Sequence, residues 1–219
     1  MEIRRLTTPM LGANTYLLSE EGRAIVVDPY AGEEGRCFLS QHVATLDYAI
    51  LTHEHYDHVS GSNWVRETCG CPVVCSRSCA DRLGNPRTNM SFYWEALCQL
   101  HGFEADIAPG LSRDYRGVAD LTFEGHLELE WQGHRLLLKE TPGHSPGSLC
   151  LLVDGHLLFS GDTMTGEHPT VLRFPGGSRR VYREQTLPWL LSLPDSVVVH
   201  PGHSEPFPLG TYRFWEQTL

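Results

Sequence analysis

The chain has 219 residues, of which 41% are hydrophobic and 20% charged, a composition typical of a folded domain rather than a disordered chain. Its 17 basic and 27 acidic residues give a formal net charge of -10 at pH 7. A surface of this sign repels phosphate backbones and anionic lipids, so neither nucleic acid nor a membrane is an expected partner. The length favours one domain over residues 1–219.

Short runs rich in Val, Ile, Leu and Tyr recur along the chain and predict β-strands. In chain order the strands are expected at residues 15–19, 24–27, 48–51, 72–75, 127–131, 135–139, 149–153, 157–159 and 196–199. Gln132-Gly133 and Asp154-Gly155 predict tight hairpin turns. Helical spacing of apolar residues predicts helices over residues 33–44, 60–68, 78–83 and 179–193, the last broken or kinked at Pro188. These elements indicate an α/β fold with helices covering the outer faces of the sheets.

Two stretches without strong strand patterns are candidates for substrate contact, because loops on a rigid scaffold usually carry it. Residues 85–111 mix turn residues with an aromatic cluster and predict a flap or helical insertion. Within it, Tyr93 and Trp94, together with Met90 and Phe92, are candidate apolar walls of a pocket, and packing of the insertion onto the body is the alternative. In the second stretch, residues 164–174, Arg173 offers a positive charge to a carboxylate-bearing substrate or is simply solvated.

The N-terminus lacks the apolar stretch of a signal peptide, and no run of about 18 apolar residues occurs. Seven cysteines are an odd number, which suits reduced thiols better than a disulfide framework. Both observations favour a cytoplasmic protein. The spacing of Cys69, Cys71, Cys75 and Cys79 is not that of common structural zinc sites. The predicted strand at 72–75 directs Cys71 and Cys75 to one face, so we expect ordinary buried thiols there, with metal binding as the alternative.

Four potential metal ligands crowd the loop that follows the buried strand at 48–51: His53, His55, Asp57 and His58. In an extended stretch the first three share one face, because side chains alternate with period 2, and His58 points elsewhere. This arrangement predicts two metal ions rather than one. Surface histidines hydrated by water are the alternative for any single residue.

Three later strand ends carry further ligand types next to a glycine, in Thr-Pro-Gly-His144, Phe-Ser-Gly-Asp162 and Val-His-Pro-Gly-His203. Binding crevices form at the carboxyl ends of strands in open α/β sheets. We expect His200, close to the last of these, to be a structural or surface residue rather than a ligand. His101 and His168 lack ligand spacing but stand in loops that could border the site.

In this order the motifs resemble the metallo-β-lactamase-fold hydrolases, and among them the short glyoxalase II-like thioesterase branch. The resemblance runs from Asn14-Thr-Tyr-Leu-Leu and Val-Val-Asp28-Pro to Pro-Gly-His203. It implies a four-layer αββα sandwich of two mixed β-sheets flanked by helices. It also implies that His53, His55 and His144 bind a first metal, that Asp57, His58 and His203 bind a second, and that Asp162 bridges them. The same resemblance places Asp28 as the partner of a ligand histidine, with a strand-end cap as the alternative.

Such a site suits two divalent ions, most readily Zn²⁺, while Fe or Mn is also compatible with imidazole and carboxylate ligands. Two cations that share a water supply a bridging hydroxide near neutral pH, and Asp57 would bind metal and orient that hydroxide. The expected reaction is therefore hydrolysis of a small thioester or ester, with no protein nucleophile.

The sequence also departs from the glyoxalase-like pattern. That pattern has Gly-Arg-Thr-Asp before Pro-Gly-Gly, where this chain has Val-Leu-Arg173-Phe, and Ser204 follows the last histidine in place of glycine. The sequence ends soon after His203, so a dedicated glutathione clamp is not expected. The commonest class B β-lactamases carry cysteine at the place of Asp162, so antibiotic hydrolysis is not expected either. A lactonase, or a mononuclear iron sulfur dioxygenase using His144, Asp162 and one earlier histidine, stays open as an alternative.

Overall fold

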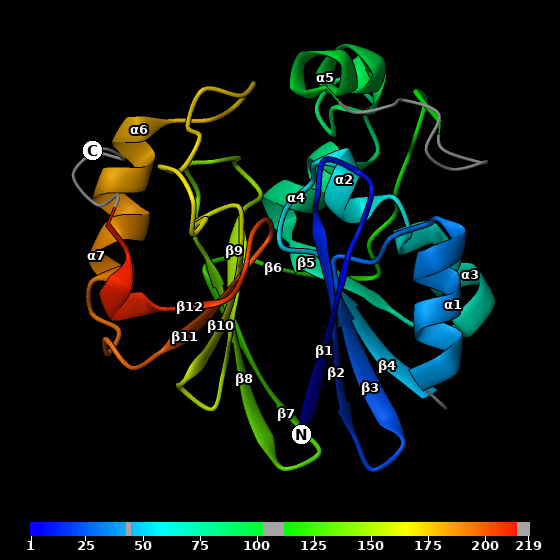
Figure 1. Ribbon diagram of the computed structural model, residues 1–219, viewed down its shortest axis with the longest axis horizontal. Helices are drawn as coiled ribbons and strands as arrows, with labels where there is room; N and C mark the ends of the chain where they lie inside the picture. Colours follow the sequence, from blue (N-terminus) through cyan, green and yellow to red (C-terminus); the bar gives the residue numbers. More distant parts are fainter. Residues whose placement is uncertain (43–44, 103–111, 214–219) are drawn as a thin grey trace.

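Two mixed sheets face each other in the computed structural model, which describes residues 1–42, 45–102 and 112–213 (Figure 1). The first sheet has the order β1 (Glu2–Thr7), β2 (Asn14–Glu20), β3 (Arg23–Val27), β4 (Thr45–Ile50), β5 (Val73–Ser76) and β6 (Leu121–Phe123). Strands β1 to β3 pair antiparallel, and β3 to β6 pair parallel. The parallel half is the part that leads into the histidine-rich loop.

The second sheet is mostly antiparallel. Its order is β12 (Phe207–Pro208), β11 (Val198–Pro201), β10 (Leu157–Gly161), β9 (Leu149–Val153), β8 (His134–Glu140) and β7 (His126–Trp131), with only β10 and β11 parallel. At the two predicted hairpin turns, Gln132 and Asp154 have φ of 48° and 50°, and each is followed by a glycine with positive φ. The predicted turns are confirmed.

Helices cover the outer face of each sheet, which confirms the αββα sandwich (Figure 1). Beside the first sheet lie α1 (Glu33–His42), α3 (Ser62–Cys69) and α4 (Arg77–Leu83). Beside the second lie α6 (Arg179–Val181), the π-helical turn η2 (Tyr182–Thr186) and α7 (Leu187–Leu190). The helix predicted over 179–193 is interrupted as expected, since Pro188 stands at the start of α7.

Alternation along the strands divides the core into layers. In β2, Leu17 packs toward the helices beside the first sheet, whereas Leu18 packs between the two sheets against residues such as Leu138. Complete burial of one such leucine contributes about 2 kcal/mol. Cys71 and Cys75 join the same helix-facing layer as buried free thiols, as the sequence predicts.

Several elements were not predicted. They are β1, β6, β12, α2 (Tyr56–Val59) and η3 (Leu209–Thr211). The 3-10 turn η1 (Ser91–Tyr93) and the helix α5 (Trp94–His101) lie within residues 85–111, where the sequence predicts a flap or helical insertion. The edge strand β1 contains Glu2, Arg4 and Arg5, so its sequence does not show the alternation of apolar and polar residues that predicts a strand. Strand β6 is short and partly exposed. Residues 43–44 of the predicted first helix and 103–111 of the predicted insertion lie outside the described residues. No helix in the described part of the chain combines the length and apolar composition needed to span a membrane.

Candidate metal centre

The histidine-rich loop leaves β4 and enters α2 within a few residues. His53 and His55 stand on irregular backbone, whereas Asp57 and His58 belong to α2, which begins at Tyr56. The expectation that His53, His55 and Asp57 share one face of an extended stretch is therefore wrong. The helical turn, rather than strand alternation, points Asp57 and His58 at the site.

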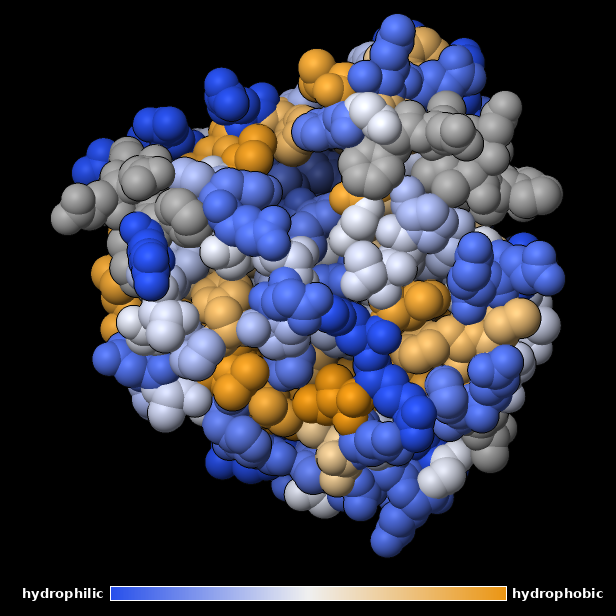
Figure 2. Space-filling model, viewed as in Figure 1, coloured by the Kyte–Doolittle hydropathy of each residue, from blue (hydrophilic) through white to orange (hydrophobic). Residues whose placement is uncertain are grey.

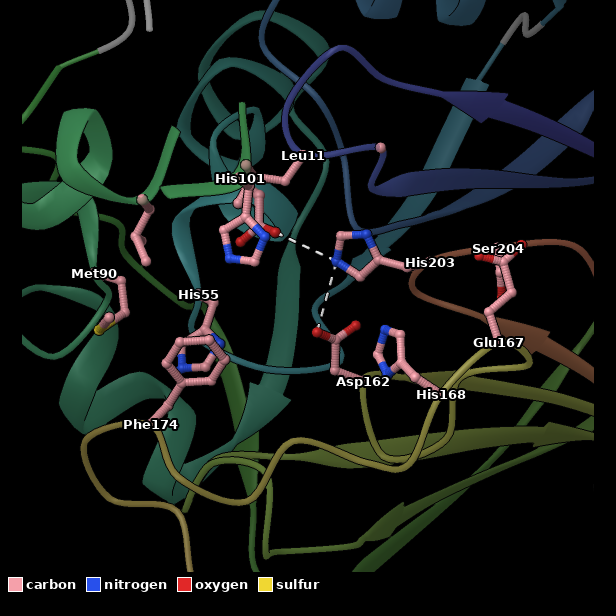
Figure 3. Close-up of a pocket in the computed structure, with 13 residues that line it drawn as sticks. Leu11, His55, Met90, His101, Asp162, Glu167, His168, Phe174, His203 and Ser204 are labelled. Carbon is pink, nitrogen blue, oxygen red and sulfur yellow. Dashed lines mark ion pairs between the residues drawn. The ribbon is translucent and has the colours of Figure 1, made fainter. Parts of the chain in front are cut away.

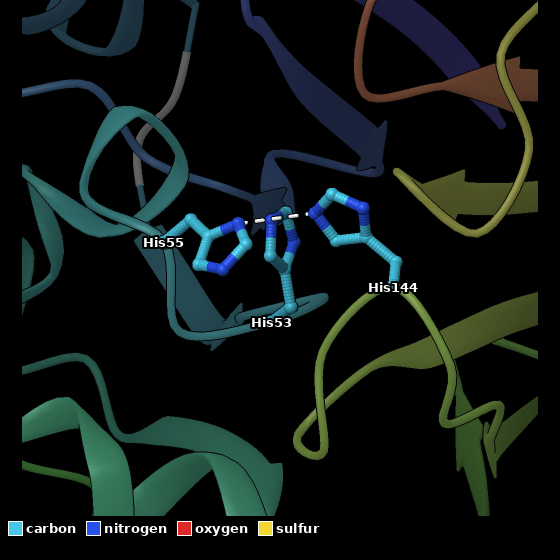
Figure 4. Close-up of side chains that lie close together, drawn as sticks. All are labelled: His53, His55 and His144. Carbon is cyan, nitrogen blue, oxygen red and sulfur yellow. Dashed lines mark hydrogen bonds between the residues drawn. The ribbon is translucent and has the colours of Figure 1, made fainter. Parts of the chain in front are cut away.

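His53, His55 and His144 form a first group, with their ligand-capable atoms within 4.8 Å of one another (Figure 4). The Nδ1 of His55 lies 3.0 Å from the Nε2 of His144. On its other side, the Nδ1 of His144 donates to the carbonyl of Val171 at 2.8 Å. That bond places the proton on Nδ1 and leaves the Nε2 lone pair of His144 facing the group.

A second group consists of Asp57, His58 and His203, also within 4.8 Å of one another. The Nε2 atoms of His58 and His203 are 3.2 Å apart. The Oδ2 of Asp57 lies 3.4 Å from the Nε2 of His203 and 3.5 Å from that of His58. Three donor atoms thus converge on one point beside the first group.

Asp162 directly follows β10 and lies close to members of both groups. Its Oδ1 is 3.5 Å from the Nε2 of His58, and its Oδ2 is 3.6 Å from the Nε2 of both His144 and His203. Gly202 makes this approach possible, because a Cβ there would collide with Asp162 and stand 2.8 Å from the ring of His58. One carboxylate thus spans both groups of candidate ligands.

Asp28 holds two of the histidines from behind. Its Oδ2 accepts from the Nδ1 of His58 at 3.1 Å and from the Thr52 hydroxyl at 2.6 Å, and its Oδ1 accepts from the Thr52 amide at 2.7 Å. Because the Thr52 hydroxyl hydrogen is used in this way, Thr52 must accept from the Nδ1 of His53, 3.1 Å away. Both histidines consequently present Nε2 lone pairs to the site.

The donor set fits divalent metal ions. Among the described residues, the Nε2 of His53, the Nε2 of His55 and the Oδ1 of Asp162 are buried without any hydrogen-bond partner. Buried polar atoms normally have one, because leaving them bare costs free energy. Imidazole and carboxylate groups are ligands of zinc and of other first-row divalent ions.

Electrostatics distinguish the two groups. Burial lowers the pKa of His55 to about 3, so this imidazole is neutral. Burial also opposes charge on His58, but Asp57 and Asp162 overcome it and raise the pKa of His58 to about 10. Burial would raise the pKa of Asp57, yet the imidazoles of His58 and His203 hold it well below its usual range. The second group therefore favours a positive charge, which either a proton or a metal ion supplies.

Glu54 was not singled out from the sequence. It is fully buried, with Oε1 2.5 Å from the Nε of Arg82, and its Oε2 accepts from the Ser145 hydroxyl at 2.9 Å. Arg82 also donates to the carbonyl of Pro175 at 2.9 Å. Glu54 thus ties the loop of His53 and His55 to the loop of His144. A glutamate between two ligand histidines was the only signal in the sequence.

A cavity of about 340 Å³ opens onto the two groups (Figure 3). Besides His55, Asp57, Asp162 and His203, it is lined by Leu11, Gly12, Met90, Leu97, His101, Glu167, His168, Phe174 and Ser204. His101 and His168 thus border the site, as the sequence suggested. The ring of Phe174 packs edge-on against those of His55 and His144.

The three predicted substrate contacts lie elsewhere. Trp94 is 4% exposed and packs against Tyr56 in the core, while Tyr93 is 36% exposed and packs against Phe92. Arg173 is exposed. None of these three is among the described residues that line the cavity. Of the apolar walls that the sequence predicted in the insertion, Met90 does line the cavity.

Comparison with known proteins decides the family. The family model of the metallo-beta-lactamase superfamily matches residues 8–203. The chain belongs to this superfamily. Metallo-beta-lactamase relatives include "Probable metallo-hydrolase YqgX" of Bacillus subtilis (strain 168), 30% identical over 93% of this chain and 90% of that protein. A hydroxyacylglutathione hydrolase of Anaeromyxobacter dehalogenans (strain 2CP-C) is 29% identical over 86% of this chain and 60% of its own length.

Solved structures of metallo-beta-lactamase proteins share the fold. Superposition on BLEG-1, a B3 metallo-beta-lactamase, gives a TM-score of 0.73 at 24% sequence identity and covers 95% of this chain and 95% of BLEG-1. TTHA1623, solved in a di-iron-bound form, has a TM-score of 0.70 at 24% identity and covers 94% of this chain and 95% of its own. The named metallo-hydrolases, together with the ligand groups, support metal-dependent hydrolysis in general terms.

Proposed function

We propose that this chain is a dinuclear metal-dependent hydrolase that cleaves a small thioester or ester, as glyoxalase II-like enzymes do. One observation carries the proposal: Asp162 lies within 3.6 Å of ligand-capable atoms in both histidine groups. Zn²⁺ is the expected ion, and Fe or Mn is compatible with the same ligands. A net charge of -10 supports a small-molecule partner over nucleic acid or a membrane.

In this proposal each group holds one ion. His53, His55 and His144 hold the first, Asp57, His58 and His203 hold the second, and Asp162 contacts both. When bound, two such cations lower the pKa of a shared water toward neutrality and polarise the carbonyl of the substrate.

The side chains of the chain itself supply orientation and proton acceptance. Asp57 is ionised, because neighbouring imidazoles depress its pKa, so both of its oxygens accept hydrogen bonds. It faces the cavity and is placed to orient an attacking water. Val171 and Asp28 keep His144 and His58 in one tautomer. Phe174 covers the rings of His55 and His144 on the cavity side and limits access of bulk water.

Metal analysis combined with a substrate panel tests the proposal. We expect about two metal ions per chain, and hydrolysis of simple thioesters or esters that a chelator abolishes and added Zn²⁺ restores. A phosphodiester should be inert. One iron per chain with oxidation of a persulfide would instead identify a sulfur dioxygenase, and faster turnover of lactones than of thioesters would identify a lactonase. Either result would overturn the proposal.

A further inference from the structure

The walls of the cavity beyond the candidate ligands are mainly apolar. Leu11, Met90, Leu97 and Phe174 come from three different segments of the chain and all line the cavity; Figure 3 labels Leu11, Met90 and Phe174. Among the described residues that line the cavity, none is an arginine or a lysine, and Glu167 adds a carboxylate. Residues 103–111 also contain no arginine or lysine in the sequence. An anionic part of a substrate that extends beyond the candidate ligands would find no arginine or lysine among these residues.

Two arginines that touch the surrounding loops, Arg5 and Arg82, already have partners, and Arg173 is exposed and is not among the residues that line the cavity. Arg5 donates to the carbonyl of Ser204 at 3.1 Å and pairs with Glu205. Arg82 pairs with the buried Glu54 and is thereby held below the site. Binding a substrate carboxylate with either one would break an ion pair inside the protein. The cavity therefore lacks the bidentate arginine that usually recognises carboxylate or phosphate.

One polar anchor in the wall is a hydrogen-bond acceptor. Thr165 uses its hydroxyl hydrogen on the carbonyl of His168 at 2.9 Å, and the Nδ1 of His168 is 3.0 Å from the carbonyl of Pro169. A carbonyl can only accept, so Nδ1 carries a proton and Nε2 is left free for a ligand. In the neutral form of the ring, Nε2 accepts from a hydroxyl or amide donor.

From these observations we propose that the cavity selects an uncharged thioester or ester with a compact apolar group, and disfavours thioesters of anionic carriers such as glutathione. The inference rests on the proposed hydrolysis and names its substrate class. Burying a carboxylate against apolar walls without a partner cation costs free energy, whereas an apolar group gains it on leaving water.

Two thioesters with the same acyl group provide the test. We expect the metal-loaded protein to hydrolyse S-benzoyl-N-acetylcysteamine with a kcat/KM at least tenfold above that for S-benzoylglutathione. Hydrolysis of both without this preference, or a preference for the glutathione ester, would overturn the selectivity and leave the proposed hydrolysis intact.

A binding measurement separates the two proposals. The thioethers S-benzyl-N-acetylcysteamine and S-benzylglutathione cannot be hydrolysed, and calorimetry should show at least tenfold tighter binding of the uncharged one. If that preference appears but the metal-loaded protein turns over neither thioester, the hydrolysis proposal fails and the selectivity of the cavity stands. Equal or tighter binding of the glutathione thioether would overturn the selectivity directly.

A matched pair of variants on α5 tests the role of the wall. Leu97 lines the cavity, whereas Leu100, three residues on, is 77% exposed and does not. Leu97→Lys should raise kcat/KM for S-benzoylglutathione relative to the uncharged thioester at least fivefold, with the gain shrinking at high salt. Leu100→Lys should leave the ratio unchanged. An unchanged ratio in Leu97→Lys, with metal content intact, would show that the apolar wall does not set the selectivity.

Discussion

Individual hydrogen bonds behind the candidate ligands fix which nitrogen faces the site. Val171 holds His144, Asp28 holds His58, and Thr52 holds His53, each through the Nδ1 atom. Ligands held in this way lose little conformational freedom when a metal binds. Asp28 has a φ of 53°, which a non-glycine residue rarely adopts, so its position is maintained at some cost in backbone strain.

Replacement of His203 should empty one metal position and spare the other. His203 belongs to the group of Asp57 and His58, and the three histidines of the first group do not depend on it. We expect His203→Ala to lower the metal content from about two ions per chain to about one, measured by atomic emission after dialysis. His156→Ala, at an exposed site, serves as the control. Two ions retained in His203→Ala would remove His203 from the ligand set.

Removal of one partner of the ion pair between Glu54 and Arg82 should strongly reduce the free energy of unfolding. Arg82→Met leaves a fully buried carboxylate without its cation, and we expect a loss of about 3 kcal/mol in the free energy of unfolding. Adding Glu54→Gln should recover part of this loss, because the unpaired charge is gone. Urea unfolding of both variants measures the difference.

The control is Arg66→Met, which breaks the exposed pair of Arg66 with Asp120 and should cost less than about 1 kcal/mol. If the double variant is no more stable than Arg82→Met, the buried charge is not the source of the loss.

At the scale of elements, strands with strong apolar runs could be predicted from the sequence, and short or charged elements could not. Tyr56 to Val59 form a single helical turn that no periodic pattern can reveal, and this turn changed the predicted orientation of Asp57. Trp94 belongs to a helix whose buried face was indistinguishable, in the sequence, from a pocket wall. The candidate ligands could be identified in the sequence because they follow the ends of predicted strands. Which of them lie close together depends on tertiary contacts that the sequence does not show.

The start of α4 provides a prediction at this scale. Ser76 caps the helix by accepting from the amide of Cys79 at 3.0 Å, and its hydroxyl donates to the carbonyl of Gly147 at 2.8 Å. We expect Ser76→Ala to lower the free energy of unfolding by about 1 to 2 kcal/mol, because both bonds are lost. Thermal unfolding followed by circular dichroism measures it. Ser78→Ala, inside the same helix, should change stability by less than half as much, and an equal effect would refute the capping role.

For the molecule as a whole, the layer between the sheets holds a polar residue. His200 stacks on Phe159 and meets Tyr16 edge-on, and neither ring nitrogen has a hydrogen-bond partner among the described residues. The sequence indicated that His200 is a structural or surface residue, and it lies apart from the candidate ligands. The strands that carry Tyr16 and Phe159 could be predicted from their apolar runs, whereas the tertiary contact that brings Tyr16 over His200 could not be inferred from one chain.

Stability toward acid should depend on His200. Burial, with a smaller contribution from Arg5, lowers the pKa of His200 to about 4, while an unfolded chain protonates it near pH 6.5. The folded state therefore binds fewer protons between these values, and its stability falls as the pH drops from about 6.5 to about 4.

Phenylalanine fits the same stacked position and does not titrate. We expect His200→Phe to gain about 2 kcal/mol relative to the wild type between pH 7 and pH 4, measured by urea unfolding. All other histidines titrate in both proteins and cancel in this difference. His156→Phe should show no such gain, and parallel stability curves for His200→Phe and the wild type would contradict the prediction.

The pairing of His58 with His203 has a consequence for synthesis on the ribosome. These two residues are 145 positions apart in the sequence. Asn14 donates hydrogen bonds to the carbonyls of Pro201 and Ser204, so the interval between its synthesis and that of its partners is longer still. At translation rates of about 5 to 20 residues per second, the second ligand group is incomplete for roughly ten seconds or more after His58 is made. In the proposed dinuclear site, the second ion can therefore meet its full ligand set only after His203, which follows β11, has left the exit tunnel, and its capture would be one of the last events in maturation.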